Sequence, residues 1–165
     1  MKTKKLTLLA LLAAIALTIF MLEAQIPSPV PIPGVKLGLA NIVTVFALYQ
    51  LGAGAALAIL LTRCLLGGLF AGNLSAMLFS VLGGLTAMLV MIFLRRLPKL
   101  SVYGVSIGGA AAHNIGQMAA AVITLGSTMV LGYLPFLLAV SLFTGALTGF
   151  ITALLLRATR HIRFH

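Results

Sequence analysis

Carboxylates are nearly absent from this sequence, which has no aspartate and only one glutamate, Glu23, among 165 residues. Paired-carboxylate catalysis and carboxylate-bound magnesium both need at least two such groups, so the sequence excludes most chemistry of these kinds. Cys64 is the only cysteine, which excludes a disulfide within the chain, and its apolar surroundings are typical of a small buried residue. The sequence has no tryptophan and only three tyrosines, and of its nine phenylalanines we expect only Phe20, Phe46 and Phe70 to be placed where they could stack on a flat ligand.

Apolar residues make up 62% of the chain, which has a mean hydropathy of +1.23 and only 7% charged residues. This composition is typical of an integral membrane protein, and we expect a single domain over residues 1–165. The net charge of +10 does not indicate a nucleic-acid partner, because the basic residues mostly lie in three short clusters at the ends of apolar segments.

Apolar runs separated by glycine, proline or basic residues predict an all-α integral membrane protein with six transmembrane helices in one compact bundle. The predicted spans are 6–24, 36–50, 53–71, 74–94, 103–125 and 133–156. The second is short for the ~20 residues that cross a hydrocarbon core, which indicates a tilted helix or one that begins below an inserted loop. We reject a cleaved signal peptide, because residues 6–22 exceed a typical signal core and Leu22 is unsuited to a cleavage site.

The basic clusters predict the orientation of these spans. They are Lys2/Lys4/Lys5, Arg95/Arg96/Lys99 and Arg157/Arg160/Arg163. With six spans all three clusters share one side, so we expect both termini in the cytoplasm and the connections after the first, third and fifth spans outside. The first outer connection, 25–34, holds four of the six prolines and is therefore stiff and extended. It is either a lid or a plain connector.

Several polar residues lie inside or at the ends of apolar segments. They are Glu23, Lys36, Asn41, Arg63, His113, Asn114 and Gln117. Because lipid cannot solvate them, they predict a ligand-binding site embedded in the membrane. Counting about 1.5 Å per helical residue places Glu23 and Lys36 near the outer surface and Arg63 near the midplane, which predicts a pocket open to the outside. We expect the ligand to be a small anionic or amphipathic molecule, and we expect no metal or cofactor.

Other interpretations of these residues stay open. His113 and Gln117, at positions i and i+4, share one helix face and would also suit a hydrogen-bond network between helices. Arg63 and Lys36 could snorkel toward the membrane surface. A central arginine costs at least ~2.5 kcal/mol on insertion scales, and we expect Glu23, the only acid, to lie several turns away from Arg63. An anionic ligand or cavity water would then balance Arg63.

Two strings carry a family resemblance: PGVKLGLANI at 33–42 and GVSIGGAAAHNIGQ at 104–117, with Arg63 between them. Over nearly the whole chain, the sequence resembles the Gx transporter family, also labelled heptaprenyl diphosphate synthase component I. That family in turn looks like the S components of energy-coupling-factor (ECF) vitamin transporters, six-helix proteins that bind ligand from outside under the first loop. S components often dock on a transmembrane partner through small residues of the first helix, which here match Ala10 and Ala14.

The resemblance implies two functions. The first is an S-component-like, non-enzymatic substrate-binding subunit of an uptake system in a bacterial cytoplasmic membrane, with a transmembrane coupling protein and ATPases as partners. The alternative is a non-catalytic component I of heptaprenyl diphosphate synthase, in isoprenoid and menaquinone precursor synthesis, with a soluble prenyltransferase as partner. Prenyl elongation uses aspartate-rich motifs that hold magnesium, so a chain without aspartate is not the catalytic subunit. A third hypothesis, an assembly partner in a membrane redox complex, has no specific support in the sequence.

Overall fold

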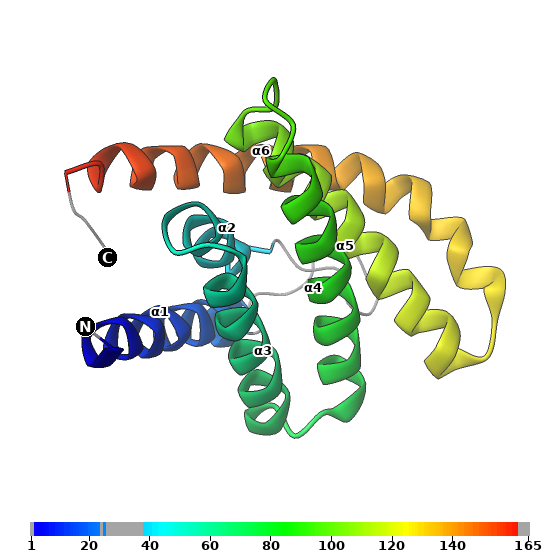
Figure 1. Cartoon of the computed structure of the whole chain (residues 1–165). Coiled ribbons are helices and arrows are strands. Elements are labelled where there is room, and N and C mark those ends of the chain that lie inside the picture. Colours follow the sequence, from blue (N-terminus) through cyan, green and yellow to red (C-terminus); the bar gives the residue numbers. More distant parts are fainter. Residues whose placement is uncertain (1, 24, 26–37, 162–165) are drawn as a thin grey trace.

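The computed structural model describes residues 2–23, 25 and 38–161 of the chain (Figure 1). Helices are the only regular secondary structure among the described residues. The elements are α1 (Lys2–Glu23), α2 (Asn41–Gln50), α3 (Ala53–Phe70), α4 (Leu74–Arg95), α5 (Val102–Leu125), the short 3-10 helix η1 (Thr128–Tyr133) and α6 (Leu134–Ala158). Lys36 and nearly all of the proline-rich connection 25–34 lie outside the described residues, so the predictions made for them stay predictions.

Four of the six predicted spans agree with α3, α4, α5 and α6 to within two residues at each end. The first helix begins at Lys2, four residues before the predicted start. The prediction that the second helix begins at residue 36 is wrong, because residues 38–40 are not helical. Gly38 has a φ of +74°, which a right-handed helix does not accommodate. The backbone carbonyl of Gly38 accepts a hydrogen bond from the backbone N–H of Asn41 at 2.9 Å, and α2 starts at Asn41.

Four segments are long and apolar enough to cross a membrane: α1, α3, α4 and η1 with α6. They fit a multi-pass membrane protein. The remaining two helices do not meet this criterion, since α2 has ten residues and the polar residues of α5 lower its hydropathy. Six spans therefore stay a prediction. In Figure 1, α3 and α4 run antiparallel while α1 and α6 lie across them, so the helices do not share one common direction.

Close packing places α2 inside the molecule and joins α5 to α6. All seven residues from Ile42 to Leu48 are buried, so other helices surround α2. On α6, a Cβ added to Gly145 would lie 2.6 Å from Cα of Ile107, and one added to Gly149 would lie 3.0 Å from Cα of Tyr103. These glycines let the α5 and α6 backbones approach closely, as small residues do between membrane helices.

The C-terminal ends of α2, α4 and α6 meet on one side of the molecule. Arg95 donates hydrogen bonds to the carbonyl oxygens of Leu48 and Tyr49, and its guanidinium carbon lies 5.0 Å from the centre of the Tyr49 ring. Nε2 of Gln50 donates to Oγ1 of Thr159 over 3.2 Å. Arg95 thus satisfies carbonyls that the end of α2 leaves without helical partners. These three ends are the ones that the charge pattern assigns to the cytoplasm.

Candidate functional site

A small cavity between the helices, which we call the polar chamber, brings together five of the seven predicted site residues. The empty space between its lining atoms, including the part open to solvent, is about 280 Å³. Its lining consists of Phe20, Glu23, Gly38, Asn41, Arg63, Ser80, His113 and Gln117. These residues come from α1, the turn before α2, and α2, α3, α4 and α5, so the chamber lies where most of the molecule converges.

Arg63 is buried in the polar chamber and only 4% of its surface is exposed. Its Nη2 donates to Oδ1 of Asn41 at 3.3 Å and lies 3.9 Å from Sγ of Cys64. The guanidinium carbon is 5.8 Å from the centre of the Phe20 ring, within cation–π range. Among the described residues, Nε has no hydrogen-bond partner. A snorkelling side chain would reach the edge of the protein, so this burial argues against that alternative.

Glu23, 5% exposed, lines the same chamber, where its Oε1 accepts a hydrogen bond from the Gly38 amide at 2.5 Å. The expectation that it lies several turns from Arg63 is wrong. Arg63 is seven residues from the last residue of α3, Phe70, and ten from its first, Ala53, so it is nearer to the end that packs on α1. Within the described part of the chain, no ion pair joins Glu23 to Arg63.

Gly67 of α3 allows α1 and α3 to approach each other closely enough for Glu23 and Arg63 to line one chamber. A Cβ added to Gly67 would lie 2.6 Å from Cε1 of Phe20, so only glycine leaves space for the phenyl ring, one turn beyond Arg63. Phe20 and Glu23 are three residues apart and therefore on nearby positions of the α1 surface. The chamber thus contains one buried carboxylate and one buried guanidinium, and no ion pair between them is present among the described residues.

His113 and Gln117 lie on one face of α5, as the i and i+4 spacing predicts, and the structure directs this face toward α4. Both side chains pack over Gly83, where an added Cβ would lie 2.9 Å from Cε1 of His113 and 2.9 Å from Cγ of Gln117. Asn114 points elsewhere: its Nδ2 donates to the carbonyl oxygen of Leu137 on α6 over 2.8 Å. Asn114 thus forms a hydrogen bond between α5 and α6, whereas the packing alternative was stated for His113 and Gln117.

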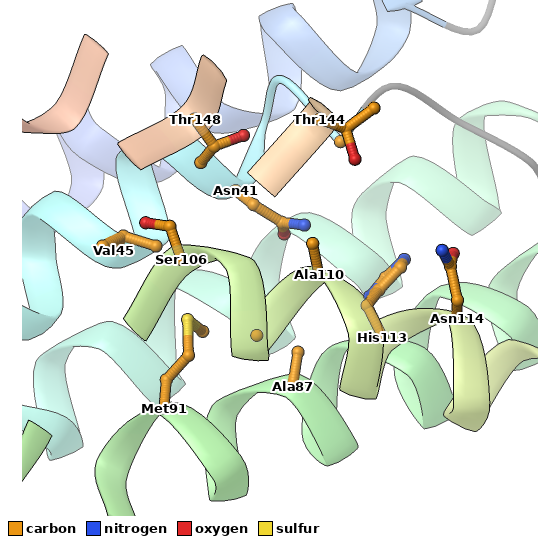
Figure 2. Close-up of a pocket in the computed structure, with 12 residues that line it drawn as sticks. Asn41, Val45, Ala87, Met91, Ser106, Ala110, His113, Asn114, Thr144 and Thr148 are labelled. Carbon is orange, nitrogen blue, oxygen red and sulfur yellow. The ribbon is translucent and has the colours of Figure 1, made fainter. Parts of the chain in front are cut away.

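Figure 2 shows the side chains around a second cavity, which we call the deep chamber. The empty space inside it, including the part open to solvent, is about 400 Å³. Gly38, Asn41 and His113 line both chambers. The other polar residues around the deep chamber are Ser106, Asn114, Thr144 and Thr148, and the other apolar ones are Val45, Ala87, Met91, Gly109 and Ala110. Six of the seven predicted site residues therefore line one chamber or the other, and Lys36 lies outside the described residues.

Ser106 is a site residue that the sequence reasoning missed. It is 3% exposed, and its Oγ has no hydrogen-bond partner among the described residues. The available signal was its position seven residues before His113, two turns back on the same helix face. A serine in an apolar helix is common enough that this spacing alone did not single it out.

The small residues predicted to dock a partner lie on the surface of α1. Ala10 and Ala14 are exposed, whereas Ala16 is buried against the core. The exposed pair is therefore not used for packing within the described structure, and its docking role stays a prediction. No group of three or more His, Cys, Asp or Glu residues among the described ones could hold a metal ion.

Comparison with known proteins gives one match. A family model described as heptaprenyl diphosphate synthase component I matches residues 12–155, a range that contains both chambers and all seven predicted site residues. No curated protein and no solved structure matches the chain.

Proposed function

The chain belongs to the heptaprenyl diphosphate synthase component I family, and we propose that it is a non-catalytic membrane component of polyprenyl diphosphate synthesis. The family name implies a second component. Elongation of a prenyl chain needs carboxylate-held magnesium, and this chain has no aspartate and one glutamate. The catalytic groups would therefore belong to a soluble, aspartate-rich partner, and this chain would hold the complex at the bacterial cytoplasmic membrane.

We further propose that the polar chamber binds an anionic group, and the observation that carries this is the unpartnered Nε of Arg63. A buried donor without an acceptor costs about 1–3 kcal/mol, and more when it is charged. A phosphate or carboxylate oxygen would supply that acceptor and would bind the guanidinium through a charge-assisted hydrogen bond. The amides of Asn41 and Gln117 line the same chamber and offer further donors.

Six spans with both termini in the cytoplasm form part of the proposal. They are supported by the meeting of the α2, α4 and α6 ends, where the exposed Arg95, Arg96 and Lys99 also lie. In this orientation the polar chamber is nearer to the outer surface and the basic ends face the compartment of the soluble partner.

The decisive measurement is the affinity of purified protein in mild detergent for inorganic diphosphate. Arg63→Gln should weaken binding about 10- to 150-fold, the equivalent of ~1.5–3 kcal/mol for a charge-assisted hydrogen bond. Arg96→Gln is the matched control, because it removes the same charge from an exposed position outside the chamber. Equal affinities of parent and Arg63→Gln protein, with both folded, would reject the anion site.

An S-component-like role in uptake is the second candidate function. The observation that favours it is that Glu23 and Gly38, which flank the first connection, both line the polar chamber. The charge pattern places this connection outside, so a ligand would enter from the outer side. Affinity purification from the native membrane separates the two candidates. A soluble aspartate-rich prenyltransferase in the complex supports the synthase role, whereas a transmembrane coupling protein with two ATPases supports uptake.

A further inference from the structure

A series of hydrogen bonds connects Glu23, the only acid of the sequence, to the buried Arg63. Oε1 of Glu23 accepts a hydrogen bond from the backbone N–H of Gly38 at 2.5 Å. The carbonyl oxygen of Gly38 accepts one from the backbone N–H of Asn41 at 2.9 Å. Oδ1 of Asn41 in turn accepts one from Nη2 of Arg63 at 3.3 Å. The end of α1, the start of α2 and the middle of α3 therefore meet in the polar chamber through consecutive hydrogen bonds.

The turn before α2 determines where the Asn41 side chain lies. Gly38 has a φ of +74°, a conformation that glycine adopts far more readily than other residues. A Cβ added to Gly38 would lie 3.2 Å from Nδ2 of Asn41, so the amide of Asn41 packs directly over this glycine. A contact that holds Gly38 in place therefore also holds the amide oxygen that binds Arg63.

The Glu23 carboxylate binds this turn although it shares the chamber with a guanidinium group. A carboxylate bound directly to Arg63 would use the N–H donors that an anionic ligand needs. Among the described residues, no ion pair joins the two side chains, and Nε of Arg63 has no acceptor. Glu23 thus supplies an acceptor to the turn and leaves Nε of Arg63 available for a ligand.

We infer that Glu23 is a positioning residue for Arg63 and not its counter-ion. It holds Gly38, Gly38 places Asn41, and the Asn41 oxygen orients the guanidinium. The inference rests on the proposed function for the purpose of this arrangement, because an oriented guanidinium serves the anion site. It assigns opposite effects to a carboxylate at two places. At position 23 a carboxylate supports the site through the turn, whereas at position 41 it would pair with Arg63 and block the site.

The first test compares the affinities of Glu23→Gln and Glu23→Met for inorganic diphosphate in mild detergent. The two new side chains are similar in size and both lack the negative charge, but only glutamine keeps an oxygen that accepts from the Gly38 amide. Glu23→Gln should therefore bind about 3- to 10-fold more tightly than Glu23→Met, the effect of about one hydrogen bond. Equal affinities of the two folded variants, or tighter binding by Glu23→Met, would show that the acceptor does not matter and would overturn the inference.

A second pair of variants changes the turn and leaves Glu23 intact. Gly38→Ala strains the backbone and displaces the Asn41 amide, so binding of inorganic diphosphate should weaken about 3- to 10-fold. Gly72→Ala is the matched control and should bind like the parent. Gly72 also has a positive φ, +60°, but a Cβ added there meets no described atom within 4 Å, and the residue lines neither chamber. Equal affinities of these two variants would contradict the inference.

Asn41→Asp places a carboxylate where the amide oxygen now contacts Arg63. It keeps the shape of the side chain and an oxygen within hydrogen-bond distance of Nη2, but it adds the negative charge that Asn41 lacks. Affinity for inorganic diphosphate should fall about 10-fold or more, because the new carboxylate pairs with the guanidinium. An unchanged affinity would show that the orientation of Arg63 by position 41 is irrelevant to the site.

The ¹⁵N NMR signal of the Arg63 Nε–H group separates this inference from the proposed function, because its measurement needs no anion. The signal is assigned by its loss in Arg63→Gln. Glu23→Met and Gly38→Ala should shift it, whereas Gly72→Ala should not. If the parent does not bind inorganic diphosphate but the signal shifts in this way, the anion site is rejected and the positioning of Arg63 stands. If the parent binds diphosphate through Arg63 and neither Glu23→Met nor Gly38→Ala shifts the signal, the anion site stands and the inference is overturned.

Discussion

Arg63 and Arg95 lie in two regions of the molecule that differ in burial and in the hydrogen-bond acceptors they offer a guanidinium group. Arg95, at the end of α4, is exposed and donates to two backbone carbonyls of α2 while stacking near the Tyr49 ring. Arg63, inside the molecule, has one amide oxygen at 3.3 Å, a weak sulfur contact and an Nε with no partner in the described chain. The exposed arginine thus has two backbone acceptors on α2, whereas the buried one has a single amide oxygen and a buried Nε without an acceptor among the described residues.

We propose that this difference reflects a structural role for Arg95 and a binding role for Arg63. The carbonyls at the C-terminal end of a helix lack helical donors and need donor partners from elsewhere, so Arg95 acts as a cap that joins α4 to α2. A buried charge with an open donor destabilises the folded protein unless something else binds it. We therefore interpret Arg63 as a residue retained for a ligand, and the predictions below test whether the two arginines differ in this way.

The largest expected effect is the presence or absence of thiol labelling, which reports the side of the membrane that the C-terminal ends of α2, α4 and α6 face. In a Cys64→Ala background, Thr3→Cys and Phe164→Cys should resist an impermeant thiol reagent applied to intact cells. Ser127→Cys, in the connection between α5 and α6, should react. Modification of position 3 or 164 from outside would contradict the cytoplasmic placement of the termini and of the capped helix ends.

Next in size is the effect of Arg95→Gln on stability. Losing its hydrogen bonds to the Leu48 and Tyr49 carbonyls should lower the free energy of unfolding in detergent by about 1–2 kcal/mol. Affinity for inorganic diphosphate should not change, because Arg95 lines neither chamber. Arg63→Gln should do the reverse, with unchanged or higher stability and weaker binding. If both variants lose stability and keep their affinity, both arginines are structural and the comparison fails.

The smallest expected effect tests whether binding needs the planar guanidinium of Arg63 or only its positive charge. Arg63→Lys keeps the positive charge but lacks the planar guanidinium with its Nε donor. We expect it to bind inorganic diphosphate several-fold more weakly than the parent and several-fold more tightly than Arg63→Gln, as measured by calorimetry. Full recovery by lysine would show that only the charge matters and that the open Nε of Arg63 is not a ligand contact.

Most of the helix boundaries were predictable because they depend on local sequence. Glycine, proline and basic residues interrupt the apolar runs, and four spans agree with the structure to within two residues. The start of the second helix was not, since nothing in the apolar pattern shows that Gly38 takes a positive φ. Glu23, Asn41, Arg63, His113 and Gln117 were expected together because lipid cannot solvate them, and the structure brings them to one chamber.

By itself, the sequence determined the all-helical class, the membrane character, the positions of most helices and the identity of the residues that need a polar environment. Each of these follows from composition and spacing along the chain. Only the tertiary structure decided that Glu23 and Arg63 share a chamber, that Ser106 lines a second one, and that Arg95 caps α2. The physical reason is that the depth of a residue and its distance from residues of other helices depend on how the helices cross. Close contacts between helices, such as that of Phe20 with Gly67, determine the crossing, and counting residues along a single helix cannot reveal it.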